Sequence, residues 1–254
     1  MALIKTEEDI KYLREGGKRL GAILKKVAET VKPGIKTIEL DNLARELIKS
    51  GGDTPAFLNY RPSGAPREYP ATLCVSVNDE IVHGIPCDMV LKEGDIVGLD
   101  IGLSHHGLFV DTAVTVAVGT ISAEDQKLIN ATQEGLVAGI KAAKAGAHIG
   151  DIGEAIENVA KPYKYGVVRE LGGHGVGHKV HEDPYVPNFG KKGAGLKLKP
   201  GMVLALEPMF NKGKRDITLD DDDFTFRTLD NKKSAHFEHT ILITENGPEI
   251  ITKV

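Results

Sequence analysis

Residues 91–102 read LKEGDIVGLDIG, and residues 198–209 read LKPGMVLALEPM. The two stretches align without gaps at an offset of 107 positions, and the alignment places Asp100 on Glu207. In each stretch this acidic residue lies in or directly after an apolar run of strand length. A repeated strand that carries a repeated acid predicts that the chain holds two copies of one structural unit.

The segments around this repeat also recur in the same order. Thr6 is the expected N-cap of a first helix, which ends at 33–34, and Thr37 is expected to cap a second helix that reaches 51–52. Strand-like runs follow at 72–77, 95–102 and 108–118. Residues 122–125 then resemble 6–9 as a helix start, and helices are predicted to about residue 144 and from near 151. The first helix is indicated by one apolar stripe: Ile10, Leu13, Gly17, Leu20, Leu24, Val27 and Val31.

We therefore expect an α+β fold with a single catalytic domain spanning 1–254. Its two halves, about 1–120 and 121–254, would be related by a pseudo-two-fold axis and would pair their sheets. The stretch FVDT at 109–112 has a looser counterpart in FEHT at 237–240. Such pairing would bring four acids together at the centre: Asp100, Asp111, Glu207 and Glu238.

The acids of the first half flank a predicted turn at 103–107. If the hairpin is centred on His105 and His106, Asp100 and Asp111 lie directly opposite each other, with Cβ atoms ~5 Å apart. Two unit charges at that distance repel by about 3 kcal/mol at an effective dielectric near 20, and burial adds a desolvation penalty. We expect both histidines to lie exposed at the turn tip.

Three arrangements could make such a cluster tolerable. Some acids could be protonated, Lys or Arg could pair with them, or divalent cations could bind. No Lys or Arg occupies matching positions on these strands, and two divalent ions would balance four carboxylates. The stretch GGHGVGHKVHEDP at 172–184 adds imidazoles, and one imidazole with four carboxylates suits a hydrolytic site for Mn, Fe(II) or Co.

Composition excludes several other classes of protein. The net charge of −4 gives no indication of a DNA partner or an anionic membrane surface. Apolar runs are too short to span a membrane, and the first residues lack the apolar core of a signal peptide. Cys74 and Cys87 form neither a disulfide framework nor a CxxC motif, so we expect reduced thiols in the cytoplasm.

Over essentially its whole length the chain resembles the type I methionine aminopeptidases, which belong to peptidase family M24. The motifs that carry the resemblance are VNDEIVHGIP at 77–86, GGHGVGHKVHEDP at 172–184, ALEPM at 205–209 and FEHT at 237–240. The resemblance implies the pita-bread fold, in which two pseudo-symmetric halves form a central antiparallel sheet covered by helices. It also implies two divalent metal ions.

The resemblance further implies a metalloprotease that removes the initiator methionine from nascent proteins and peptides whose second residue is small. Asp111 and Glu238 would bridge the two ions, Asp100 would complete one site, and His174 with Glu207 would complete the other. The implied catalytic residues are His83 at the scissile nitrogen, His181 as a donor to the oxyanion, and Glu207 as the proton shuttle. His83 and His181 would also bind the substrate, together with a methionine pocket formed by Phe57, Tyr60, Tyr69 and Phe224.

The chain departs from the family at this pocket. Any of the four aromatic residues could instead belong to the hydrophobic core. Phe57 stands where many bacterial members carry a small thiol, Val180 where many carry an aromatic residue, and the loop at 59–70 is longer than theirs.

The expected partners are polypeptides with N-terminal methionine and, as a further candidate, the ribosome. We expect the protein to be a monomer. Two alternative functions are an Xaa-Pro dipeptidase or aminopeptidase of the same fold and a non-catalytic pita-bread binding protein.

Overall fold

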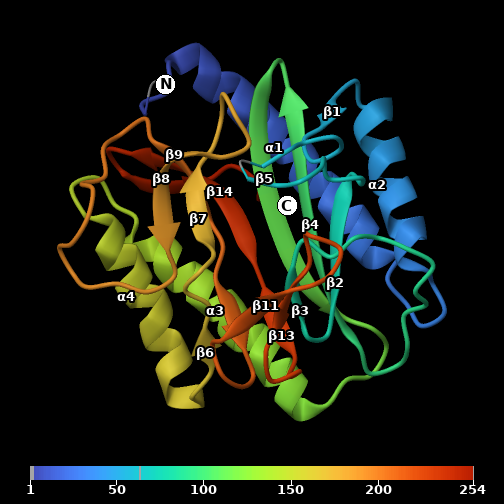
Figure 1. The fold of residues 1–254 in the computed structure, drawn as a ribbon. Helices are drawn as coiled ribbons and strands as arrows, with labels where there is room; N and C mark the ends of the chain where they lie inside the picture. The colour runs from blue at the N-terminus through green and yellow to red at the C-terminus, as the bar shows by residue number, and fades with distance from the viewer. Residues whose placement is uncertain (1–2, 63, 254) are drawn as a thin grey trace.

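The computed structural model describes residues 3–62 and 64–253, and these form a curled antiparallel sheet covered by helices (Figure 1). The helices are α1 (Glu7–Glu29), α2 (Thr37–Ser50), α3 (Ala123–Ala142) and α4 (Ile149–Ala160), with a short 3-10 helix η1 (Lys161–Tyr163). The predicted α+β combination is confirmed. Within the described part of the chain, no helix is both long and apolar enough to cross a membrane.

The central sheet contains nine strands in the order β1-β4-β5-β14-β9-β7-β8, with β2 paired to β4 and β15 paired to β14. Strands from the first and second parts of the chain meet where β5 pairs with β14. The strands of this sheet are β1 (Thr54–Pro55), β2 (Leu73–Val77), β4 (Ile96–His105), β5 (Leu108–Ala117), β7 (Gly172–Gly175), β8 (Glu182–Pro187), β9 (Val203–Leu206), β14 (Glu238–Thr244) and β15 (Gly247–Ile250).

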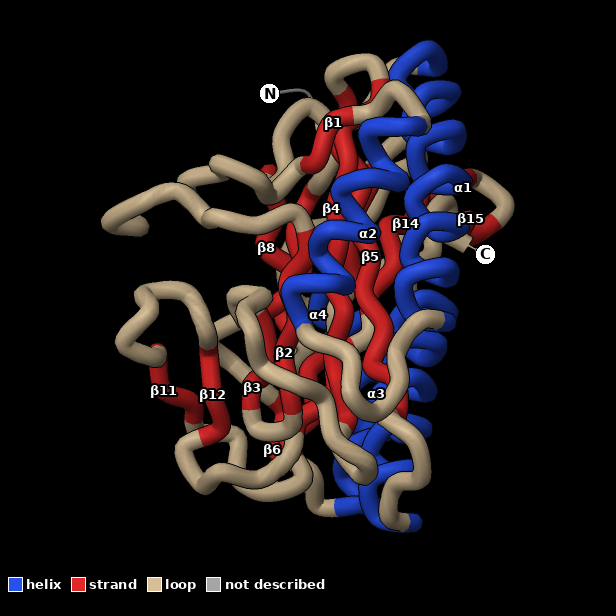
Figure 2. The backbone as a smooth tube through the Cα atoms, turned by 90° about the vertical axis from the view of Figure 1, so that its right-hand side faces the viewer, coloured by secondary structure: helices blue, strands red, loops and turns tan. Residues whose placement is uncertain are grey.

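Two small three-stranded sheets lie beside the central one. The first has the order β13-β10-β6 and contains β6 (Gly166–Val167), β10 (Met209–Asn211) and β13 (Ser234–His236). The second has the order β11-β12-β3 and contains β3 (Glu80–Val82), β11 (Ile217–Leu219) and β12 (Phe226–Thr228). Figure 2 shows β3, β11 and β12 on the side of the central sheet away from α1.

The helices cover one face of the central sheet (Figure 2). Thr6 caps α1 as predicted, by accepting a hydrogen bond from the backbone N–H of Asp9. The apolar stripe of α1 buries Leu13, Leu20 and Val27 against β4 and β5, and each such side chain contributes roughly 1.5–3 kcal/mol on burial. Helices α3 and α4 form a second core with β9 and β14. The opposite face of the sheet is therefore left for the site.

The predicted cap of α2 is wrong by one residue. Lys36 occupies the N-cap position, and its backbone N–H is bound by the side chain of Glu39. Thr37 is the first helical residue, and its hydroxyl bonds the backbone N–H and C=O of Cys87 instead. A threonine hydroxyl can satisfy either an adjacent helix end or a distant loop, and the sequence does not distinguish the two.

The hairpin of β4 and β5 turns one position later than predicted. His105 pairs with Leu108, and the turn consists of His106 and Gly107 with φ values of 51° and 80°. Positive φ at both positions is typical of a two-residue type I′ turn. Asp100 therefore pairs with Ala113 rather than with Asp111. The two acids are diagonal neighbours but remain on one face, because side chains alternate with a period of two.

The expectation that both histidines lie exposed at the turn tip is wrong for His105. His106 is exposed and stacks on Tyr12, but His105 is only 5% exposed. Helix α1 covers His105 because Gly16 allows close approach; a Cβ there would lie 3.0 Å from that of His105. Its Nδ1 lies 2.7 Å from Oδ1 of Asp53, which satisfies this buried ring atom.

Candidate functional site

The register of the central sheet places on one face five side chains of the types that can bind metal ions. Asp100 lies opposite Ala113, which lies opposite Glu238 across β5 and β14. His239 pairs with Leu206, so Glu238 lies opposite Glu207, the residue that follows β9. His174 pairs with Ala205, two positions before Glu207. Because side chains alternate along strands, the face without helices carries all five: Asp100, Asp111, His174, Glu207 and Glu238.

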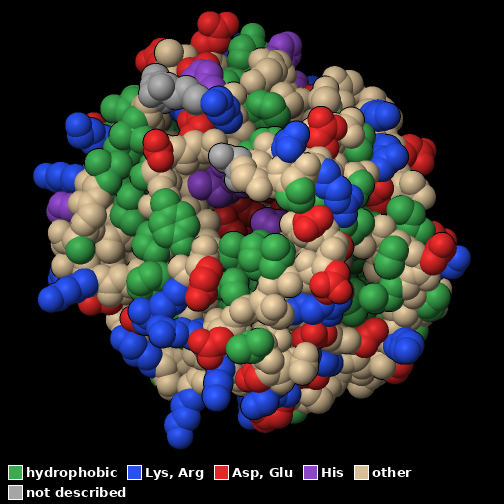
Figure 3. Space-filling model, in the orientation of Figure 1, with side chains coloured by type: hydrophobic (Ala, Val, Ile, Leu, Met, Phe, Trp, Pro, Cys, Tyr) green, Lys and Arg blue, Asp and Glu red, His purple; other side chains and the backbone are tan. Residues whose placement is uncertain are grey.

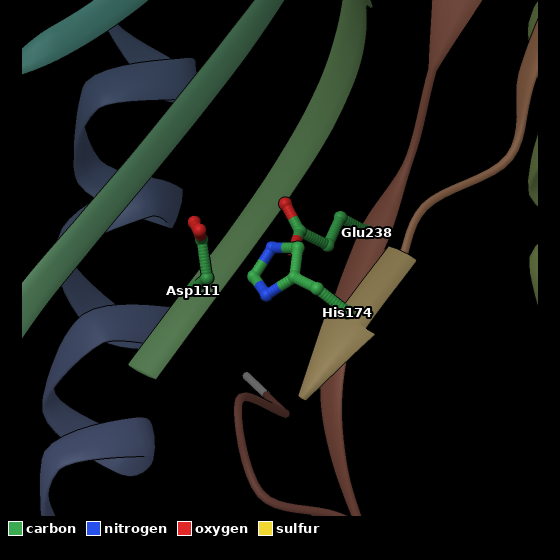
Figure 4. Close-up of side chains that lie close together, drawn as sticks. All are labelled: Asp111, His174 and Glu238. Atoms are coloured by element: carbon green, nitrogen blue, oxygen red, sulfur yellow. The ribbon is translucent and has the colours of Figure 1, made fainter. Parts of the chain in front are cut away.

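Three of these side chains converge at the centre of the sheet. Figure 4 shows Asp111 on β5, His174 on β7 and Glu238 on β14 pointing toward one another. One ligand atom from each lies within 4.8 Å of the others. Nε2 of His174 also lies 3.6 Å from Oε1 of Glu207. Within the described chain, the four acids and the imidazole therefore lie on one face of the sheet, and their role as metal ligands stays a prediction.

The carboxylates of this cluster are buried without neutralising partners. Oδ1 of Asp100, Oδ1 of Asp111 and Oε1 of Glu238 have no hydrogen-bond partner among the described residues. Burial raises the pKa of Asp100 to about 7. Burial, followed by the charges of its neighbours, raises the pKa of Glu238 well above its usual range. Such a set of groups retains protons unless a cation replaces them.

The orientation of His174 leaves one ring nitrogen available as a ligand. Its Nδ1 lies 2.9 Å from the carbonyl oxygen of Gly175. A carbonyl oxygen only accepts, so Nδ1 carries the proton and Nε2 keeps its lone pair. Burial lowers the pKa of this imidazole to about 3, which keeps it neutral. A neutral histidine whose second nitrogen donates to a backbone carbonyl is the usual form of a metal-binding histidine.

These observations fit a divalent metal centre. Unpaired carboxylate oxygens and a free imidazole nitrogen are the ligands that hydrolytic metals use. A cation would also offset both the burial and the mutual repulsion that raise the pKa of Asp111 and Glu238. Within the described residues, the side chains paired with Glu207 are neutral imidazoles and not Lys or Arg: His174 at 3.6 Å and His236 at 3.8 Å.

A pocket opens above the acids and contains every residue predicted for the site. Figure 3 shows a hollow with acidic side chains at its floor and histidines at its rim. Phe57, Tyr69 and Phe224 belong to a separate apolar cluster that forms one wall. The pocket lining consists of Phe57, Tyr60, Pro62, Tyr69, Cys74, His83, Asp100, Asp111, His174, His181, Glu207, Phe224 and Glu238.

His83 is held in an unusual backbone conformation. Its φ is 61°, a region that side chains other than glycine seldom adopt. Such strain persists where the surrounding structure enforces it, and it is common at functional sites. Burial lowers the pKa of His83 to about 4, so its ring is neutral at the pocket.

Two features of the site are not evident from the sequence. Cys74 lines the pocket, and it does so because it pairs with Asp100 across β2 and β4. Burial raises the pKa of its thiol, so it is a wall residue and not a nucleophile. The second feature is a groove that shares four lining residues with the pocket: His83, His174, His181 and Glu207. The remaining lining residues of this groove are Val82, Glu170, Leu171, Gly172, Lys179, Glu182, Asp183 and Tyr185.

The sequence matches metallopeptidase family M24 over residues 11–245, and the chain belongs to this family of metal-dependent hydrolases. Within it, the similar full-length relatives are methionine aminopeptidases. Methionine aminopeptidase 1 of Bacillus subtilis is 44% identical, with 100% of both chains covered. The crystal structure of methionine aminopeptidase from Thermotoga maritima has a TM-score of 0.94 at 40% identity and covers 99% of each chain.

These comparisons confirm the predicted resemblance and the pita-bread fold, and membership in the family implies a divalent metal. The Xaa-Pro dipeptidase from Bacillus anthracis also superposes, with a TM-score of 0.76 at 23% identity. The present chain covers 62% of that protein, so this likeness concerns the fold alone.

Proposed function

We propose that this chain is a methionine aminopeptidase that removes the initiator methionine from nascent proteins and peptides whose second residue is small. The observation that carries the proposal is the floor of the pocket, where buried, unpaired carboxylates and a free imidazole nitrogen face an aromatic wall. Full-length relatives at 44% and 45% identity are methionine aminopeptidases.

We propose two divalent ions, of Co, Mn or Fe(II), at this floor. Asp111 and Glu238, which lie on the two central strands β5 and β14, would hold both ions. Asp100 would help to hold one of them from the β4 side, and His174 with Glu207 would help to hold the other from the β7 and β9 side. A divalent ion supplies Lewis-acid polarisation of a carbonyl and lowers the pKa of a water molecule.

The chain's own residues then bind and orient the substrate. Phe57, Tyr60, Tyr69 and Phe224 surround the methionine side chain, whose flexible thioether packs well against aromatic rings. His181 donates a hydrogen bond to the carbonyl oxygen as negative charge develops there. His83 contacts the nitrogen of the scissile bond. Glu207 accepts a proton from the water that adds to the carbonyl carbon and passes this proton to the leaving amine as the C–N bond breaks. The acids at the floor of the pocket favour a free, positively charged α-amino group, and this preference restricts cleavage to the N-terminus of the substrate.

The test compares peptides that differ in one feature. Met-Ala-Ser should be cleaved, whereas acetyl-Met-Ala-Ser should be inert because it lacks the free amine. A chelator should abolish cleavage, and Mn or Co should restore it. Anomalous scattering from metal-soaked crystals would count and identify the ions.

Each alternative function predicts a different result. An Xaa-Pro peptidase would cleave a peptide such as Leu-Pro-Ser in preference to Met-Ala-Ser. A non-catalytic binding protein would cleave none of them and would bind its partner regardless of the chelator. Either result would overturn the proposal.

We propose that the chain acts as a monomer in the cytoplasm, where new polypeptides emerge. The ribosome is a further proposed partner. A surface hollow supports this, because its lining has five cations against two acids and clustered cations attract phosphates. The cations are Lys161, Lys164, Arg169, Lys214 and Arg215, and the acids are Glu157 and Asp216. Salt-dependent co-sedimentation with ribosomes and light scattering of the free protein test these two proposals.

We also propose that 1–254 is one catalytic domain with pseudo-symmetric halves at about 1–120 and 121–254. The sequence of elements supports this proposal. Two helices and the β4–β5 hairpin in the first half correspond to α3, α4 and the β9–β14 pair in the second.

A further inference from the structure

Tyr60 contacts the proposed oxyanion donor directly. Its hydroxyl oxygen lies 2.9 Å from Nδ1 of His181. The two rings also meet edge to face, with centroids 5.4 Å apart. Both residues line the pocket, so the contact fixes the imidazole beside the acids.

The backbone around Tyr60 holds this hydroxyl in place. The N–H of Tyr60 donates to the carbonyl of Phe57 at 2.9 Å, and the N–H of Tyr69 donates to the carbonyl of Tyr60 at 2.8 Å. The loop between Tyr60 and Tyr69 is anchored across the pocket by Arg67. This guanidinium donates to the carbonyl of Asp222 at 2.8 Å and lies over the ring of Phe224.

The contact has a consequence for the location of the imidazole proton. A neutral imidazole has one nitrogen that donates and one that accepts. Phenols, whose ordinary pKa is near 10, are stronger donors than a neutral imidazole N–H. Burial raises the pKa of Tyr60, so its hydroxyl stays protonated and able to donate. The favoured arrangement therefore has the Tyr60 hydroxyl donating to Nδ1 of His181. The proton of the ring then resides on Nε2.

We propose that Tyr60 is a positioning residue that fixes His181 in the tautomer with Nε2–H, so that Nε2 can donate to the carbonyl oxygen of the scissile bond. In the other tautomer Nε2 would present a lone pair to that oxygen, which is repulsive. The catalytic part of this inference rests on the proposed function, but the tautomer itself does not.

The first test reads the tautomer without any reaction. Nitrogen NMR of 15N-histidine-labelled, metal-free protein distinguishes the two tautomers, and the variant His181→Ala assigns the signal. We expect the proton on Nε2 in the wild type and a mixture of tautomers in Tyr60→Phe. A proton on Nδ1 in the wild type, or an unchanged signal in Tyr60→Phe, would overturn the proposal.

The second test is a double-mutant cycle on cleavage of Met-Ala-Ser. Tyr60→Phe keeps the aromatic wall and removes only the hydroxyl. We expect kcat to fall by about tenfold, less than the 10²–10³ typical of losing an oxyanion donor outright, with KM changed by under about twofold. In the His181→Ala background the same substitution should have no further effect on kcat. Equal effects in both backgrounds would show that Tyr60 acts independently of His181.

Tyr163→Phe is the matched control, because it removes a tyrosine hydroxyl from an exposed ring in η1. It should alter neither kcat nor the His181 signal. If the wild type cleaves no peptide, the proposed function fails, while the NMR result still decides whether Tyr60 sets the tautomer.

Discussion

At the scale of single residues, the site depends on carboxyl groups that the fold holds in an unfavourable environment. Burial raises the pKa of Asp100 to about 7, and burial with the charge of Asp100 raises that of Asp111 well above its usual range. The metal-free protein therefore keeps protons at a place where the unfolded chain would release them. Metal binding should release these protons, so affinity should increase with pH.

Asp100→Asn should change how the stability of the metal-free protein depends on pH. The folded pKa of Asp100, about 7, exceeds the unfolded value of about 3.9. The folded state thus binds more protons between these values, and Asp100 destabilises it increasingly as pH rises from about 4 to about 7. Relative to wild type, the free energy of unfolding of Asp100→Asn should rise across this window. Urea unfolding with a chelator, at several pH values, measures it.

The stability of Asp100→Asn must be compared with that of the wild type at each pH, because the buried histidines change the stability of both proteins with pH in the sense opposite to Asp100. Burial lowers the pKa of His174 and His236 to about 3, and their neutral forms favour folding as pH rises. Their contribution cancels in the difference between the two proteins. Asp88→Asn, at an exposed pair with Lys36, should not show this rise, because the hydrogen bond and charge of Lys36 lower the pKa of Asp88. A difference that shrinks with rising pH would contradict the assignment of a raised pKa.

At the scale of elements, the β4–β5 hairpin sets the spacing of Asp100 and Asp111. Its tight turn needs positive φ at His106 and Gly107, which the hydrophobic pattern alone does not reveal. The identities of the acids could be predicted, because each interrupts an apolar strand and recurs in the second half. The register could not be predicted, since moving the turn by one position shifts the pairing by two residues and leaves the same side chains on each face of the sheet.

Gly107→Ala should destabilise the protein through this turn. The φ of Gly107 is 80°, and a Cβ added there would meet no atom within 4 Å, so the penalty is backbone strain alone. A left-handed conformation costs roughly 1–2 kcal/mol for a residue with a Cβ. The melting temperature should fall by roughly 2–4 °C per kcal/mol for a chain of this size. Calorimetry of the metal-free protein measures the change.

Gly98→Ala on β4 is the matched control in the same hairpin. A Cβ there would lie 3.7 Å from the nearest atoms, which is ordinary contact, and its φ lies outside the left-handed region. This variant should stay within about 0.5 kcal/mol of wild type, as most tolerated substitutions do. Equal destabilisation of the two variants would mean that the turn conformation is not the cause.

At the scale of the whole molecule, segments distant in sequence surround the pocket together. The fold could be predicted from the sequence, and the proposed ligands stay a prediction that the shared face of the sheet supports. The burial of His105 under α1 and the contact of Tyr60 with His181 could not be predicted. Both depend on which surfaces meet after folding. The ion pair of the N-terminal segment could not be predicted from the sequence either. Nζ of Lys5 lies 2.5 Å from Oε2 of Glu182 at the start of β8.

Lys5→Met should be strongly destabilising. Both side chains of this pair are almost fully buried, and removal of one partner leaves a buried charge uncompensated. Such a loss typically costs roughly 3–5 kcal/mol, whereas replacing both partners is often nearly neutral. We expect Lys5→Met with Glu182→Gln to recover most of the stability. Denaturant unfolding of both proteins measures the difference.

The exposed pair of Arg14 and Glu249 provides the control. Arg14→Ala should cost under about 1 kcal/mol, because water screens the pair. If the single variant Lys5→Met lost no more than Arg14→Ala, the bridge would not join the N-terminal segment to β8 in solution.

All five proposed ligands depend on strands that alternate with a period of two. A slip of β14 by a single position would turn Glu238 toward the helices and dismantle the coordination shell, even if the hydrophobic contacts survived. Stoichiometric metal uptake would therefore report that a molecule has folded in the correct alignment. Misregistered chains from a refolding mixture could be separated from native ones by their failure to retain the ion.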